Sequence, residues 1–218
     1  MDTKELSKSM LKSSTSLVSI KCSDGVVLAA DRQVTAGNLV VGKNFEKIFP
    51  VRNNLLVAFT GGVADAQILM RLISAELKLK ELKSKRPATV KESASLLSMM
   101  TFRNIRQPSM IPAVVGTLIA GVNSNGEAKL FSIEPAGAIS EVEDYDANFS
   151  SGMPYILGVL ERSWKKDMTV KQGVQLAVEC LKASTQRDVG SGYGIDVYAL
   201  TIAGIKKVVS QEIEAVFK

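Results

Sequence analysis

The order of strand-like and helix-like segments constrains the fold of this sequence more than any other feature. Short strand-like runs open the chain and two helix-like segments follow; strands and a second helix pair then repeat the pattern before two closing strands. Helices grouped in pairs between antiparallel strands favour layered sheets with helices outside, rather than an alternating parallel fold. We therefore predict a protein of the α+β class.

Hydrophobic periodicity and capping residues locate the helices. Apolar residues recur at near-helical spacing over residues 65–82, a segment that ends in a lysine-rich turn. Thr89 with Glu92, and Thr169 with Gln172, have the form of capping boxes, in which two side chains satisfy free backbone N–H groups. The expected helices are 65–82, 93–105, 153–165 and a fourth that ends at Arg187.

The strand-like runs fill most of the remaining chain and are separated by turn residues such as those of the 123–126 segment. No linker-like or low-complexity stretch divides them, and a chain of 218 residues can bury one sizeable core. We therefore expect a single domain. Its expected strands are 16–21, 26–30, 55–59, 113–122, 128–133, 138–145, 195–202 and 205–210.

Composition argues against several classes of protein. The longest apolar runs, such as 111–122, are shorter than the roughly 20 residues of a membrane-spanning helix. Residues 1–14 lack the apolar centre of a secretory signal, so we expect a cytoplasmic protein with no membrane partner. The net charge of +5 comes from scattered lysines, and we expect no nucleic-acid partner. A charge-driven module that binds nucleic acid or a membrane surface remains the alternative from a different class.

The chain contains no histidine, which excludes a Ser-His-Asp or Cys-His mechanism and the usual histidine-bearing zinc sites. Cys22 and Cys180 form no CxxC pattern, and we expect both to be buried small apolar residues. The remaining hydrolytic arrangements are a Ser-Lys pair, a carboxylate pair or an N-terminal nucleophile. The last fits best, because an α-amino group with a pKa of about 7.7 to 8.0 can accept the hydroxyl proton near neutral pH. Such a site needs no metal or organic cofactor.

Two segments near the N-terminus carry a specific resemblance. The Thr15-Ser16-Leu17-Val18 segment looks like the start of a mature proteasome β-type subunit, and 24–32 is the strongest single match to that family of N-terminal-nucleophile threonine proteases. The resemblance is greatest to archaeal members and implies a four-layer α/β/β/α sandwich, the Ntn-hydrolase fold, with two antiparallel sheets between helix pairs. It also implies a propeptide at 1–14 and a single mature domain at 15–218. Further matches, in family order and spacing, lie at 43–44, 47–49, 61–66, 132–137, 151–152, 158–161, 187–188, 191–192 and 195–197.

The resemblance implies a role for each matching polar residue. Thr15 would be the nucleophile after autocatalytic cleavage between Ser14 and Thr15, Asp31 and Lys47 would be its charge partners, and the Gly61 N–H would form the oxyanion hole. The residues expected to support the threonine amine and a water that takes part in proton transfer are Ser151, Asp188 and Ser191. Each residue also has an ordinary interpretation as an ion pair, a helix cap or a solvated carboxylate, so the hypothesis depends on the whole set.

The family resemblance also implies a substrate pocket beside Thr15. Its lining would be apolar, so we expect cleavage after apolar residues, although the bulky Phe59 could fill the pocket and restrict that preference to smaller side chains. Ordinary core packing is the alternative interpretation of these side chains. The expected pocket residues are Val34, Phe45, Phe49, Phe59 and Val63.

The partners implied by the resemblance are other β subunits and α subunits in heptameric rings that form a barrel, an ATPase regulatory complex, and unfolded proteins as substrates. Ser14 departs from the Gly-Thr junction at which family members release their leader, and Gln33 stands where the family often has arginine. The first alternative is therefore an unprocessed, non-catalytic structural β subunit of a mixed β ring. A bacterial-type two-ring relative of the proteasome is a further alternative.

Overall fold

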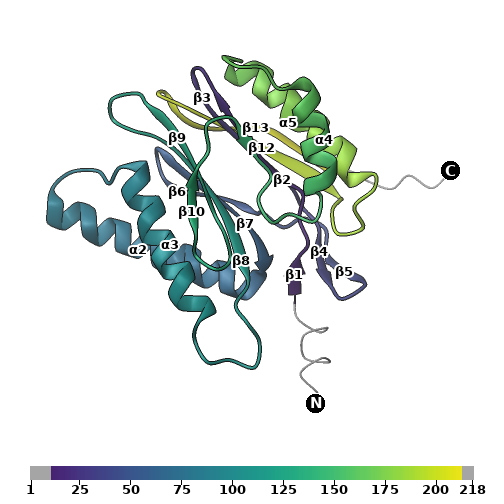
Figure 1. Ribbon diagram of the computed structural model, residues 1–218, viewed down its shortest axis with the longest axis horizontal. Helices are drawn as coiled ribbons and strands as arrows, with labels where there is room; N and C mark the ends of the chain where they lie inside the picture. The colour runs from purple at the N-terminus through teal and green to yellow at the C-terminus, as the bar shows by residue number, and fades with distance from the viewer. Residues whose placement is uncertain (1–10, 213–218) are drawn as a thin grey trace.

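A computed structural model describes residues 11–212, with side chains from Ser14 onward. The first ten residues of the predicted propeptide and the last six residues of the predicted domain lie outside that range. Two antiparallel sheets lie face to face, with one pair of helices on each outer side (Figure 1). This arrangement confirms the predicted α+β layered fold.

The larger sheet has eight strands in the order β10-β9-β8-β7-β1-β4-β5, and β6 pairs with β7 beside this path. All its pairs are antiparallel, and the β7–β8 register places Ala58 opposite Leu118. The strands are β1 (Leu11–Ser13), β4 (Val34–Ala36), β5 (Leu39–Gly42), β6 (Ile48–Arg52), β7 (Leu55–Gly62), β8 (Val115–Val122), β9 (Ala128–Ile133) and β10 (Ile139–Glu141).

The smaller sheet has five antiparallel strands in the order β11-β2-β3-β12-β13. Its central strand β3 is buried along its whole length, so one face packs on the larger sheet and the other on helices. The strands are β2 (Leu17–Cys22), β3 (Gly25–Asp31), β11 (Tyr145–Asp146), β12 (Gly194–Thr201) and β13 (Gly204–Glu212).

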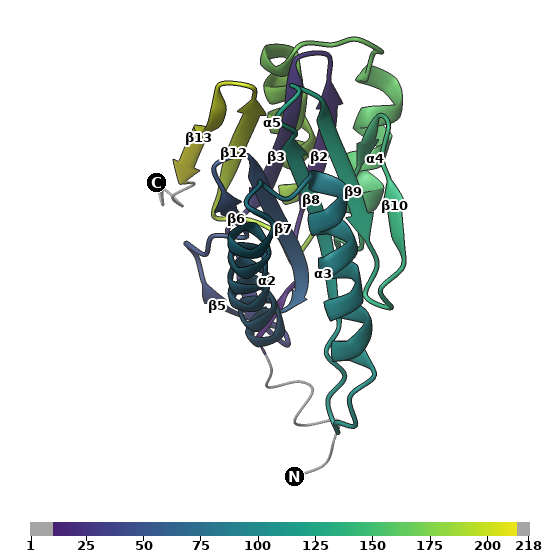
Figure 2. The same ribbon diagram turned by 90° about the vertical axis from the view of Figure 1, so that its left-hand side faces the viewer.

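Four helices in the described part of the chain cover the sheets. Helices α2 (Val63–Ser84) and α3 (Val90–Ile105) lie side by side over the larger sheet (Figure 2), and α4 (Met153–Ser163) and α5 (Val170–Thr185) cover the smaller one. Both predicted capping boxes are present: Thr89 and Glu92 cap α3, and Thr169 and Gln172 cap α5. Among the described residues, no helix combines the length and apolar character needed to cross a membrane.

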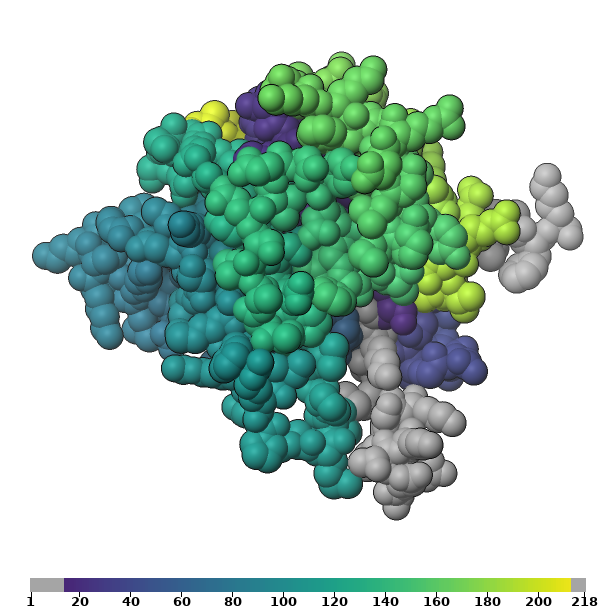
Figure 3. Space-filling view, viewed as in Figure 1, coloured from purple at the N-terminus to yellow at the C-terminus, as the bar shows by residue number. Residues whose placement is uncertain are grey.

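The core has three layers of apolar side chains, one between the two sheets and one under each helix pair. Leu28 and Leu56 meet in the central layer, whereas Ile73 packs α2 on the larger sheet. Cys22 at the end of β2 and Cys180 on α5 are buried free thiols, as expected from the sequence, and burial raises the pKa of each to about 12. In contrast, Met110 is exposed on the loop 106–114, at the lower edge of the molecule (Figure 3).

One expected strand was wrong. The segment 138–145 is divided into β10, which pairs with β9 in the larger sheet, and β11, which pairs with β2 in the smaller sheet. The chain changes sheets between them, and Lys21 N–H donates to the Asp144 carbonyl oxygen where it arrives. Four short strands, β1, β4, β5 and β6, were not expected from the sequence.

Candidate active site

The chain passes from one sheet to the other at Thr15. This residue follows β1 of the larger sheet and directly precedes Ser16 and β2 of the smaller sheet, and its side chain is buried. Asp31 ends β3, and Lys47 directly precedes β6. Residues from both sheets therefore meet where the predicted propeptide joins the predicted mature domain.

Asp31 is the centre of a dense set of hydrogen bonds. Lys47 Nζ lies 2.7 Å from Asp31 Oδ1, and Ser16 N–H donates to the same oxygen at an N···O distance of 2.9 Å. The other oxygen, Oδ2, accepts from the N–H groups of Gln33 at 2.9 Å and Gly192 at 3.0 Å. Because four donors face one buried carboxylate, its position and its orientation are both fixed.

Burial and the partner charge act in opposite directions on this pair. Burial lowers the pKa of the Lys47 ammonium below its ordinary value, while Asp31 and, more weakly, Asp188 oppose that shift. Burial likewise raises the pKa of the Asp31 carboxyl, against Lys47 and the backbone N–H groups of Gly192 and Ser16. Each charge is thus the principal group that stabilises the other in this buried pair.

The Ser14–Thr15 peptide unit and the next one are held by hydrogen bonds on both sides. Lys47 Nζ lies 3.4 Å from the Ser14 carbonyl oxygen. The Thr15 carbonyl oxygen accepts from Ser151 Oγ at 3.2 Å and from the Gly152 N–H at 3.3 Å. The only ammonium group at this junction therefore belongs to a lysine that already contacts Asp31, as far as the described residues show.

Ser151, Asp188 and Ser191 are brought together as expected. Asp188 Oδ2 accepts from Ser151 Oγ at 2.6 Å and from Ser191 Oγ at 2.5 Å. Ser151 therefore does not act as a helix cap, and α4 begins after Gly152 without a side-chain capping bond. The carboxylate Asp188 orients both hydroxyl groups, one of which reaches the Thr15 carbonyl.

Gly61 lies beside the junction in a conformation that requires glycine. The β1–β7 register places Ser13 opposite Gly61, one residue before Ser14. Gly61 has φ +104°, and a Cβ there would collide with the carbonyl oxygen of Val114 on the neighbouring chain segment. Backbone rather than a side chain is thus presented next to the Ser14–Thr15 bond.

Three of the five predicted pocket residues form an aromatic cluster. Phe59 is fully buried, stacks on Phe49 with ring centroids 5.5 Å apart, and meets Phe45 edge-on at 6.4 Å. Val34 and Val63 are also buried. The structure therefore supports the core-packing interpretation for Phe59, whose ring occupies the centre of this cluster.

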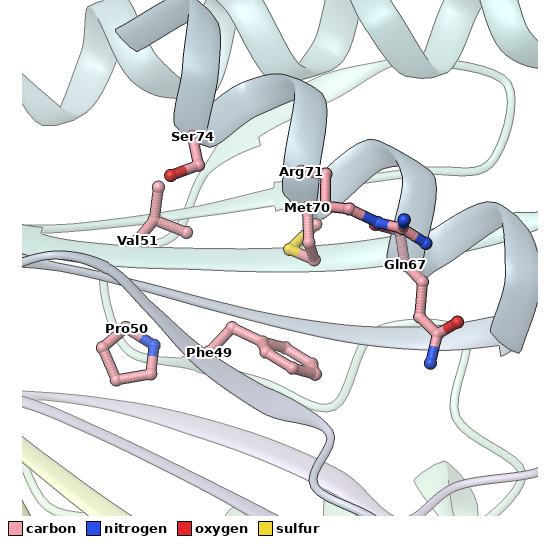
Figure 4. Close-up of a pocket in the computed structure, with 7 residues that line it drawn as sticks. All are labelled: Phe49, Pro50, Val51, Gln67, Met70, Arg71 and Ser74. Carbon is pink, nitrogen blue, oxygen red and sulfur yellow. The ribbon is translucent and has the colours of Figure 1, made fainter. Parts of the chain in front are cut away.

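A groove opens between β6 and α2 (Figure 4). Of the predicted pocket residues, Phe49 lines it, whereas Thr15, Asp31 and Lys47 do not. The groove is thus separate from the junction. Its lining residues are Phe49, Pro50, Val51, Gln67, Met70, Arg71 and Ser74.

Comparison with known proteins identifies the family. The family profile described as "Proteasome subunit" matches residues 11–200, which is most of the chain. The chain belongs to the proteasome subunit family. The sequence-based resemblance is thereby confirmed.

Curated relatives of this proteasome subunit are of the β type. It is 42% identical to the "Proteasome subunit beta" of Nanoarchaeum equitans over 194 residues, which cover 89% of this chain and 96% of the relative. It is 38% identical to the protein of the same description from Methanobrevibacter ruminantium over 204 residues, 94% of each chain. The subunit is therefore of the β type and assembles with other proteasome subunits.

Sequence reasoning missed two buried serines of this proteasome subunit. Ser16 Oγ donates to Ser191 Oγ at 2.8 Å and also pairs with Ser184 Oγ. Ser191 in turn donates to Asp188. The three hydroxyl groups therefore form a chain of hydrogen bonds in which Ser184 donates to Ser16, Ser16 to Ser191, and Ser191 to the carboxylate. Ser16 follows the predicted nucleophile directly, which was an available signal, but nothing in the sequence brings Ser184 of α5 to the site.

Proposed function

We propose that this proteasome β subunit is catalytic: a threonine-type endopeptidase that hydrolyses peptide bonds of unfolded proteins with Thr15 as its N-terminal nucleophile. Residues 1–14 would be a propeptide that the subunit removes from itself, leaving 15–218 as the mature domain. One observation carries the proposal, namely that Lys47 Nζ lies 2.7 Å from Asp31 and 3.4 Å from the Ser14 carbonyl oxygen. A buried cation at the carbonyl of the bond to be cleaved is suited to stabilise developing negative charge.

The pairing of β1 supports self-cleavage. Strand β1 is hydrogen-bonded between β4, where Lys12 lies opposite Thr35, and β7, where Lys12 lies opposite Gly62. An extended peptide gains affinity from such main-chain bonds without a requirement for particular side chains. Removal of the propeptide would leave the β4 and β7 edges available to pair with an extended substrate, whose bond to be cleaved would then lie beside Thr15.

The self-cleavage step begins with attack of the Thr15 hydroxyl oxygen on the Ser14 carbonyl carbon. Lys47 and the Gly61 N–H would stabilise the resulting oxyanion, and Asp31 keeps Lys47 charged. The proton that the Thr15 hydroxyl loses is transferred to the Thr15 nitrogen as the C–N bond breaks, which leaves the Ser14 carbonyl carbon bound to the threonine oxygen as an ester. Water then hydrolyses that ester, releasing residues 1–14 and a free Thr15 amine.

The free amine would be the base in each later turnover. An unperturbed α-amino group has a pKa of about 7.7 to 8.0, so a free Thr15 amine can take the hydroxyl proton near neutral pH. It would do so as the Thr15 oxygen attacks the substrate carbonyl, and would then pass the proton to the leaving amine. Water hydrolyses the acyl ester in a second step. The hydroxyl groups of Ser151 and Ser191, held by Asp188, would orient the amine and this water. Nucleophile, base and stabilising charges all come from the chain, so this mechanism needs no cofactor.

The apolar surroundings favour substrates with apolar residues on the acyl side. Because Phe59 is buried between Phe45 and Phe49, the space left beside Thr15 should suit small apolar side chains better than large ones. The proposed setting is a cytoplasmic barrel of heptameric β and α rings, supplied with unfolded protein by an ATPase complex.

The alternative is an unprocessed structural β subunit in a mixed ring, and Ser14 is the observation that favours it. A serine before Thr15 places a side chain beside the bond to be cleaved, where a glycine would leave space. In that case the Thr15 nitrogen stays an amide and cannot act as the base.

Intact mass of the subunit after assembly with an α partner, alone and with any second β subunit, decides between the two. The catalytic proposal expects a chain that begins at Thr15 and hydrolyses short peptides. Thr15→Ala should retain residues 1–14 and abolish peptide hydrolysis. Thr15→Ser keeps a hydroxyl and should therefore show partial release of residues 1–14 and partial peptide hydrolysis. A wild-type chain that keeps Ser14 in every assembled particle would exclude the free-amine mechanism.

A further inference from the structure

The side chain of Ser14 faces a glycine. A Cβ built on Gly190 would lie closer to Ser14 Cβ than non-bonded carbon atoms approach one another, and only 3.2 Å from Ser14 Oγ. It would also lie 3.1 Å from Ser151 Oγ. The space that the Ser14 side chain occupies is therefore space that any residue larger than glycine at position 190 would need.

Backbone conformation does not explain this glycine. Gly190 is not among the described glycines with positive φ, a group that includes Gly61 and Gly194. An alanine can therefore adopt the backbone conformation of residue 190 without strain. The obstacle to alanine is steric: its methyl group would overlap the Ser14 side chain.

Neither partner can move away easily. The Gly190 N–H donates to Asp188 Oδ1 at 3.1 Å, and the side-chain amide of Gln33 donates to the Val189 carbonyl at 2.7 Å, so the loop is held from both sides. On the other partner, the Ser14 carbonyl contacts Lys47. Gln33 thus fixes the loop that carries Gly190.

We propose that Gly190 is the residue that admits a serine before the cleaved bond, and so determines which junctions this subunit can cleave in itself. The absence of a side chain at 190 compensates for the presence of one at 14. This inference rests on the proposed self-cleavage, and it makes Gly190 a specificity-determining residue for that reaction rather than a catalytic one.

The test follows the release of residues 1–14 by intact mass over time, in particles assembled with the α partner. Gly190→Ala should slow release roughly ten- to a hundredfold, the range expected when one overpacked methyl group in a rigid site acts on the reacting geometry. Ser14→Gly alone should be released at least as fast as wild type. In the Ser14→Gly background, Gly190→Ala should change the rate by less than about twofold, because the two sites then share no contact.

Two controls isolate the contact. Ser14→Ala keeps the Cβ and removes only the hydroxyl, so in the Gly190→Ala background it should stay slow. A Gly190→Ala chain produced with Thr15 already exposed, by removal of a fused leader with a specific protease, should hydrolyse peptides like the unmutated exposed chain. A loss of activity there would mean that the added methyl group acts through Ser151, and would overturn the inference.

Equal release from wild type and Gly190→Ala would also overturn it and leave the catalytic proposal standing. Slow release from the Ser14→Gly/Gly190→Ala pair would do the same. If neither wild type nor Ser14→Gly releases its leader, and the chain with exposed Thr15 is inactive, the proposed catalytic function itself fails and this inference fails with it.

Discussion

Lys47 Nζ lies 2.7 Å from Asp31 Oδ1, and neither side chain is exposed to solvent. The pair joins the end of a strand in the smaller sheet to the start of a strand in the larger one. It therefore connects the two sheets at the Ser14–Thr15 junction, and its two buried charges stabilise each other.

Lys47→Met should abolish release of residues 1–14 and also destabilise the protein by about 3–5 kcal/mol, because it leaves a buried carboxylate without a counter-ion. Adding Asp31→Asn removes the unpaired charge and should recover part of that stability without recovering processing; the recovery is partial because the amide nitrogen cannot accept from the backbone N–H groups that face the carboxylate. The two quantities are the melting temperature of the assembled particle and the mass of the subunit. A double variant no more stable than Lys47→Met would contradict the prediction.

Asp196→Asn should lower stability by about 3 kcal/mol, because it removes the buried carboxylate charge that pairs with both Arg32 and Lys207. Arg32 Nη2 and Nε lie 2.6 Å and 3.2 Å from the Asp196 carboxylate, and this partner raises the pKa of the guanidinium. Glu143→Gln, which breaks the exposed pair with Lys21, is the matched control and should cost less than about 1 kcal/mol. Thermal unfolding of both variants measures this difference in stability. Equal decreases in melting temperature for the two variants would contradict the prediction.

Phe59→Ala should widen the acyl-side preference toward larger apolar residues, since it removes the ring stacked on Phe49. The cavity should cost about 3–5 kcal/mol of stability. Ratios of kcat/KM for peptides with alanine, leucine or phenylalanine before the cleaved bond give the preference, and Phe59→Leu should fall between wild type and alanine. An unchanged ratio would show that this cluster is core and not part of the pocket.

The stabilisation from the capping box of α3 should decrease at low pH, whereas the stabilisation from the capping box of α5 should not change with pH. The Arg86 guanidinium, and next the Thr89 N–H, lower the pKa of Glu92 in the folded protein. Its contribution is thus fully present above the unfolded pKa of about 4.3 and is lost as pH falls below that value toward the lower folded pKa. Gln172 has no charge to lose.

Thr89→Ala and Thr169→Ala should each cost about 1 kcal/mol at neutral pH.

Glu92→Gln tests the acid dependence directly. It should flatten the fall in melting temperature below pH 5 while keeping much of the cap, because glutamine is the natural partner in α5. If the melting temperature of Glu92→Gln falls with decreasing pH as steeply as that of wild type, then other carboxylates cause the loss of stability in acid.

The sequence by itself determined the elements whose signals are local. Thr89 with Glu92, and Thr169 with Gln172, start their helices in the predicted places because a cap bonds residues within one turn. Residues 128–133 form the strand expected from their pattern. The family motifs also located Thr15, Asp31 and Lys47, which the structure brings together.

Only the tertiary structure decided the rest. The segment 138–145 had one continuous pattern, yet its halves pair with different sheets, because pairing depends on the neighbouring strand and not on the segment itself. The same reason applies to Ser184, which reaches Ser16 from a helix far along the chain. The contact between Ser14 and Gly190 was likewise hidden: a serine that looks unfavourable in the sequence lies against the residue that leaves room for it.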